Sequence, residues 1–134
     1  MKLLILHGPN MNLIGIRSAK SGKRITLNKI NSHIRKFIRA LNIEIKVIQT
    51  HNEVKAVSYL HKNRNKFDGI ILSPGVWMNS GYLLKETLEI ISIKYVLIYL
   101  DKNIKSNNIF KSEKYFFDNN ILKSFEEAIL NYVS

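Results

Sequence analysis

The sequence contains no cysteine. A disulfide framework, a thiolate nucleophile and a cysteine metal site are therefore excluded. The chain also lacks a long uncharged apolar run, and it lacks a basic-then-apolar leader that ends in small residues. Neither a membrane span nor a signal peptide is indicated. We therefore expect a cytoplasmic protein without a membrane partner, because reducing conditions suit a chain free of disulfides.

Acidic residues are scarce, with 10 Asp and Glu against 21 Lys and Arg, so the formal net charge is +11. Clustered cations of this kind neutralise phosphates in nucleic-acid-binding proteins. Here the cations are spread along the chain, and no nucleic-acid motif accompanies them, so specific nucleic-acid binding is not expected. The chain is also rich in Lys, Asn and Ile and poor in Ala, as an AT-biased coding sequence would produce. Compositional drift is a second explanation for part of the charge.

The pattern of apolar residues predicts one α/β domain over residues 1–134. The chain is long enough for one hydrophobic core and too short for two ordinary domains. Short runs typical of strands lie at residues 3–6, 43–48, 70–72, 95–100 and 114–117. Apolar residues at helical spacing lie between and after them, at 27–41, 54–60, 83–91 and 122–132. Such alternation favours a flavodoxin-like open parallel sheet with helices on both faces.

Two further features follow from this predicted sheet. Thr26 and Asn52 are suitable N-caps for the first two helices. Ligands of such folds bind outside the carboxyl ends of the strands, where this chain has Asn10 and Asn12 and the segments 50–52, 73–75 and 99–101. The segment from Gly15 to Arg24 contains four basic residues. We expect it to be a mobile loop that covers this edge.

Residues 7–17, HGPNMNLIGIR, resemble the opening signature of the type II 3-dehydroquinate dehydratases, Gly-Pro-Asn-x-Asn-Leu-x-Gly-x-Arg after a strand. The family's order of motifs continues at residues 49–53, 73–75 and 93–100, so the resemblance covers nearly the whole chain. It implies a flavodoxin-like fold and the conversion of 3-dehydroquinate to 3-dehydroshikimate in the shikimate pathway. It further implies a small anionic substrate, no cofactor and no metal, and a homo-oligomer of trimers combined into dodecamers.

The family reaction passes through an enolate. A Tyr in the flap, made more acidic by a nearby Arg, removes a proton beside the ketone. A His then protonates the departing hydroxyl, and an Asn holds the enolate through water. Backbone N–H groups and a Ser hydroxyl receive the substrate carboxylate.

The resemblance transfers these catalytic roles only in part. Asn12 matches the Asn that holds the enolate, and Arg17 matches the Arg of the flap. The Tyr base falls at Gly22, which cannot take a proton. The acid His falls at Tyr99, and the Glu that orients it falls at Leu97.

The resemblance places the substrate-binding positions at Asn10, Ser73, Asn79, Leu100, Asp101 and Lys111. Asp101 stands where the family has the Ser that receives the carboxylate, so a like charge would repel the substrate. Lys111 keeps the charge of a family Arg but not its bidentate fork. Glu86 retains an acidic position that reaches a neighbouring subunit in the family.

Three functions remain open at this point. The first is a family member with lost or strongly reduced activity, and the second is an active enzyme whose base is a substitute residue. The third is a noncatalytic module that binds an acidic ligand, nucleic acid or a protein partner. His51 is interpreted either as a relocated acid or as a cap of the next helix. Tyr99 is either a replacement base or an aromatic residue that fills the vacated space.

Overall fold

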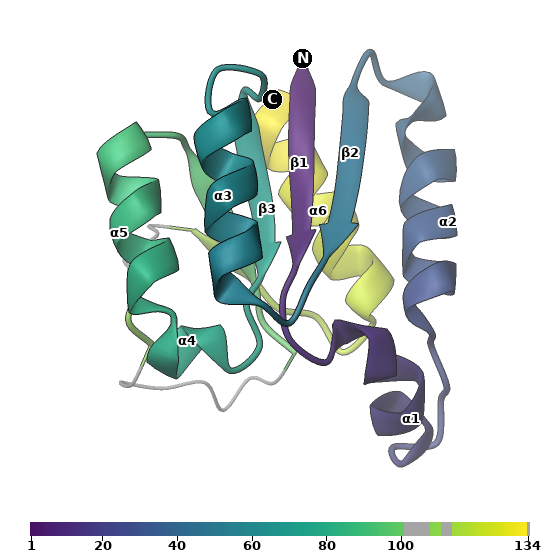
Figure 1. The fold of residues 1–134 in the computed structure, drawn as a ribbon. Helices are drawn as coiled ribbons and strands as arrows, with labels where there is room; N and C mark the ends of the chain where they lie inside the picture. Colours follow the sequence, from purple (N-terminus) through teal and green to yellow (C-terminus); the bar gives the residue numbers. More distant parts are fainter. Residues whose placement is uncertain (101–107, 111–113, 134) are drawn as a thin grey trace.

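The computed structural model of the protein describes residues 1–100, 108–110 and 114–133 (Figure 1). Its strands are β1 (Lys2–His7), β2 (Glu44–Gln49), β3 (Gly69–Ser73), β4 (Tyr95–Ile98) and β5 (Tyr115–Phe116). They form one sheet of order β2-β1-β3-β4-β5 in which every neighbouring pair is parallel. This is the flavodoxin-like order. The predicted fold class is confirmed.

Helices cover both faces of the sheet (Figure 1). The helices are α1 (Ile14–Ala19), α2 (Leu27–Phe37), α3 (Glu53–Asn63), α4 (Trp77–Ser80), α5 (Tyr82–Ile91) and α6 (Ile121–Val133), with short 3-10 turns η1 (Met11–Leu13) and η2 (Ile38–Ala40). Helices α2 and α6 contact each other on one face, and α3 and α5 contact each other on the opposite face.

The two central strands are apolar because both of their faces are covered. Leu3 and Ile5 of β1 pack with the α2 and α6 side, whereas Leu4 and Leu6 pack with the α3 and α5 side. All four are 0% exposed. A strand buried on both faces reads as a continuous apolar run, which is why residues 3–6 could be recognised from the sequence.

Two predicted helix caps are confirmed. Thr26 Oγ1 accepts a hydrogen bond from the backbone N–H of Lys29 at 3.2 Å. Asn52 Oδ1 accepts one from the backbone N–H of Lys55 at 3.1 Å. Each cap satisfies a donor that the first turn of its helix leaves unpaired. His51 therefore does not cap α3; its neighbour does.

The prediction of a loop from Gly15 to Arg24 is wrong for its first part, because α1 occupies Ile14–Ala19. Ile14 is buried, and Gly15 packs so closely on Thr26 that a Cβ would lie 3.0 Å from its Cγ2 atom. Ser18 Oγ then accepts from the backbone N–H of Ile25 at 2.8 Å and closes the following turn. Tertiary contacts thus offset the weak local preference for a helix. The predicted mobility of this segment remains a prediction.

Candidate active site

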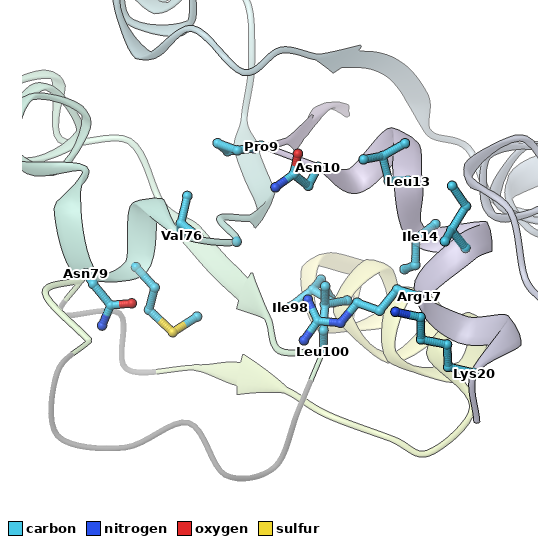
Figure 2. A pocket seen from close by; sticks show the side chains of 13 residues that line it. Pro9, Asn10, Leu13, Ile14, Arg17, Lys20, Val76, Asn79, Ile98 and Leu100 are labelled. Atoms are coloured by element: carbon cyan, nitrogen blue, oxygen red, sulfur yellow. The ribbon is translucent and has the colours of Figure 1, made fainter.

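A cavity of about 500 Å³ lies beyond the carboxyl ends of the strands, at the predicted edge of the sheet (Figure 2). The loop after β1, the segment of α1 and Lys20, the residues after β3 and the end of β4 form it. Its lining is Pro9, Asn10, Leu13, Ile14, Ile16, Arg17, Lys20, Gly75, Val76, Met78, Asn79, Ile98 and Leu100. A cavity of this size, mostly apolar with a few polar side chains, suits a small ligand.

Two glycines lock the loops after β1 and β3 to each other. The backbone N–H of Gly8 donates to Ser73 O at 2.8 Å, and a Cβ on Gly8 would lie 2.7 Å from Pro74 O. Gly75 has a φ of 56°, and a Cβ there would lie 2.9 Å from Pro9 O. Neither position has room for a side chain. The Gly-Pro-Asn and Ser-Pro-Gly motifs are therefore held together by backbone packing.

Asn10 is the polar residue that the first loop contributes to the cavity wall (Figure 2). It has a φ of 67° in the left-handed region, which Asn tolerates better than most residues. Its backbone N–H donates to His51 Nδ1 at 3.2 Å. This bond brings the exposed imidazole of His51 beside a residue of the cavity.

The charged side chains in the described lining of the cavity are those of Arg17 and Lys20. Arg17 lies on α1 and Lys20 directly follows this helix. Arg17 reaches toward Ile98 and Leu100 at the end of β4 (Figure 2). Asn79 lies on the opposite wall. The described lining includes no Asp, Glu, His or Tyr. The cavity therefore has a cationic side at α1 and a neutral polar side at α4.

Several predicted site residues lie elsewhere. Asn12 is exposed on η1 and lines neither of the two cavities at this edge. Ser73 is 1% exposed and turns into the interior. Glu86 is exposed on α5. Asp101 and Lys111 lie outside the described residues.

Ser73 is held by His7, the last residue of β1. His7 is 0% exposed; its Nδ1 atom lies 2.9 Å from Ser73 Oγ, and its Nε2 atom lies 3.1 Å from Asn31 Oδ1. Since Asn31 Oδ1 can only accept, Nε2 carries the proton and Nδ1 accepts from the Ser73 hydroxyl. Burial lowers the pKa of His7 to about 4, against a raising contribution from the bond to Asn31. His7 thus joins β1, β3 and α2 beneath the site.

Tyr99 lines a second cavity of about 670 Å³, which lies between the α1 turn and the segment before α6. Its hydroxyl accepts from Asn108 Nδ2 at 2.6 Å, and its ring stacks on Tyr115 with centroids 4.7 Å apart. Burial raises the pKa of Tyr99, the bond from Asn108 lowers it, and the Tyr115 phenol raises it. A raised pKa disfavours the phenolate that a base needs. The geometry favours the space-filling interpretation.

Polar oxygens of the second cavity serve the local backbone. Asp118 Oδ1 accepts from the N–H of Asn120 at 2.8 Å, and Asn120 Oδ1 accepts from the N–H of Leu122 at 3.1 Å. Ser18 bonds Ile25. These groups are already satisfied, so the first cavity is the better candidate for ligand binding.

Two residues of the site were missed from the sequence. Lys20 was interpreted as a charge of a mobile loop, although it follows Arg17 by one helical turn, which was the available signal. His7 directly precedes the Gly-Pro-Asn motif, but its burial could not be read from that position. Within the described ranges, no group of three or more His, Asp or Glu could hold a metal ion. Nor does any described helix have the length and apolar character needed to cross a membrane.

The chain is similar to known proteins along most of its length. The sequence profile described as Dehydroquinase class II matches residues 1–124. The 3-dehydroquinate dehydratase of Geotalea daltonii is 30% identical over 115 residues, 86% of this chain and 79% of that protein. That of Pelotomaculum thermopropionicum is 32% identical over 111 residues, 83% of this chain and 76% of that protein.

The fold is also found in a crystal structure of a type II dehydroquinase from Butyrivibrio crossotus. The TM-score is 0.89 at 23% sequence identity, with 100% of this chain and 98% of that chain covered. This likeness shows the shared fold. The signature after β1, the flavodoxin-like sheet and the profile match over residues 1–124 together establish that the chain belongs to the class II dehydroquinase family.

Proposed function

We propose that the protein binds a small anion of the 3-dehydroquinate type and dehydrates it at a strongly reduced rate or not at all. One observation carries the proposal: the described lining of the cavity contains no side chain that exchanges a proton near neutral pH. Gly22 stands at the position of the family's Tyr base, and no heavy atom lies within 4 Å of the place where its Cβ would be.

The expected loss of rate follows from the separate contributions of the base and the acid. Positioned general acids and bases each contribute roughly 10²–10⁴-fold to rate. Arg17 and Lys20 can attract the substrate and stabilise an enolate, but as cations they do not remove a proton. We therefore expect the protein to bind the substrate even though its turnover is strongly reduced or lost.

A spectrophotometric assay of 3-dehydroshikimate formation tests this proposal. The purified protein is compared, at equal concentration, with the dehydratase of Pelotomaculum thermopropionicum. We expect at least a hundredfold lower turnover, with 3-dehydroquinate binding still detectable by calorimetry. Turnover within a hundredfold of that relative would overturn the proposed loss of activity.

An active enzyme with a substitute proton donor is the second candidate function. The bond from Asn10 N–H to His51 Nδ1 favours it, because it brings an imidazole beside the cavity. If turnover is found, His51→Ala should reduce it at least tenfold. His61→Ala, which removes an exposed imidazole from α3, is the matched control and should leave it unchanged.

We also propose that the protein is a homo-oligomer built from trimers and able to combine into dodecamers. The outward face of α5 supports this, because Tyr82, Leu83 and Ile90 are 64%, 46% and 73% exposed, and Glu86 lies among them. Such an apolar face is typical of subunit interfaces. Light scattering should show an oligomer, and Ile90→Lys should shift it toward monomers. A monomeric wild-type protein at micromolar concentration would contradict the proposal.

A further inference from the structure

We propose that Lys20, together with Arg17, receives the carboxylate of the bound ligand, so that the acid group lies against α1 and not against the end of β4. This inference rests on the proposed function, namely that the cavity binds a small anion of the 3-dehydroquinate type. It assigns a ligand-binding role to Lys20, which the family resemblance does not mark as a site residue.

The distribution of charge in the cavity is the first argument. Arg17 and Lys20 are the charged residues in its described lining; Arg17 belongs to α1, and Lys20 is the residue directly after it. Asn10 and Asn79, on the other walls, are neutral (Figure 2). An anion in the cavity is drawn toward the side with the cations by Coulomb attraction.

Helical geometry explains why the two cations act together. Arg17 and Lys20 are three residues apart, and residues at this spacing lie on the same face of a helix. The first turn of α1 is fixed because Ile14 and Gly15 are buried. Beyond the helix, the N–H of Lys20 donates to Ser18 O, and Ser18 Oγ is bonded to Ile25. The backbone that carries Lys20 is therefore anchored on both sides.

Neither cation has an anionic partner among the residues that the structure describes. Within those ranges, ion pairs link His33 to Glu126 and Lys85 to Glu89 and do not involve α1. An unpaired guanidinium and an unpaired ammonium on one helical face can together bond both oxygens of a carboxylate. The sequence also argues against the alternative receptor, since Asp101 stands where the family has a Ser, and a carboxylate there repels another.

Calorimetric titration with 3-dehydroquinate tests the assignment on the whole protein. We compare wild type with Lys20→Gln, and use Lys23→Gln as the matched control, because Lys23 lies in the same segment and lines the second cavity instead. Lys20→Gln should weaken binding about tenfold, as expected for one charge-assisted contact. Lys23→Gln should change it less than about twofold. Lys20→Arg should remain close to wild type.

The methyl ester of 3-dehydroquinate lacks the charge of the carboxylate, so it separates the contribution of this group to binding from that of the rest of the ligand. Wild type should bind the ester more weakly than the acid, whereas Lys20→Gln should bind both with similar affinity. Equal effects of Lys20→Gln and Lys23→Gln on the acid would overturn the inference and leave the proposed function intact. If wild type binds neither compound, the proposed ligand class is wrong and the inference falls with it.

Two controls keep these outcomes distinct. Thermal melts should show that Lys20→Gln is folded, which we expect because its side chain is exposed. Arg17→Gln provides a second removal of charge from the same wall and should also weaken binding of the acid. If the wild type turns out to be active, the same comparison can be read from KM.

Discussion

The two sides of the cavity are held in different ways. The loops after β1 and β3 are fixed by backbone contacts, in which Gly8 and Gly75 leave no room for a Cβ. On the other side, Arg17 and Lys20 extend from α1 and contact the cavity through flexible side chains (Figure 2). Packing therefore constrains the residues of the locked loops, whereas the two cationic side chains on the other side are exposed.

The interlocked loops provide the largest expected effect. Gly8→Ala would place a Cβ 2.7 Å from Pro74 O and 2.9 Å from Ser73 O, and neither backbone atom can rotate away. We expect the free energy of unfolding to fall by about 3 kcal/mol, as in other overpacked interiors. Urea denaturation monitored by circular dichroism measures this loss.

Gly22→Ala is the matched control for that variant. Gly22 has a positive φ of 92°, as Gly75 has one of 56°, but a Cβ at Gly22 would meet no heavy atom within 4 Å. Only the preference of Ala for negative φ opposes the change, so we expect the free energy of unfolding to fall by about 1 kcal/mol. If Gly8→Ala lowered the free energy of unfolding no more than Gly22→Ala, close packing of the two loops would not be the reason for a glycine at position 8.

His7, beneath the loops, makes stability depend on pH. Its folded pKa is about 4, below the ordinary 6.5, so the unfolded chain takes up a proton first as pH falls. The stabilisation is complete above pH ~6.5 and decreases as pH falls toward ~4, by about 2 kcal/mol at pH ~5. Urea denaturation at several pH values should show this slope. In His7→Asn the contribution should disappear; an unchanged slope would show that other groups produce it.

Tyr99→Phe separates packing from chemistry at the second cavity, which Tyr99 lines. The variant removes the hydroxyl that accepts from Asn108 Nδ2 and keeps the ring that stacks on Tyr115. We expect about 1 kcal/mol less stability and no change in any residual turnover. Tyr115→Phe should leave stability unchanged, because Tyr115 is 60% exposed. Loss of turnover in Tyr99→Phe alone would restore Tyr99 as the base.

The smallest expected effect distinguishes the two asparagines of the signature. Asn10 lines the cavity and Asn12 does not. Asn10→Ala should weaken 3-dehydroquinate binding several-fold, about the contribution of one hydrogen bond, whereas Asn12→Ala should leave it unchanged. Calorimetric titration measures both. The opposite result would support the assignment that the resemblance makes to Asn12.

Much of the fold could be predicted because its signals are local. The run at residues 3–6 is apolar throughout, as expected for a strand covered on both faces. Thr26 and Asn52 cap their helices with side chains that act within three residues. Alternation of strands and helices then leaves few topologies, because crossovers between parallel strands are right-handed. Periodicity and turn chemistry therefore sufficed for the architecture.

The sequence by itself determined the α/β class, the caps and the family signature. Only the tertiary structure decided that α1 is helical, that Ser73 turns to His7 across 66 positions of sequence, and that Tyr99 faces the second cavity. A side chain at a strand end has several directions open to it, and contacts distant in sequence select among them. For the same reason Lys20, a loop charge in the sequence, became part of the cavity wall once α1 was packed against Thr26.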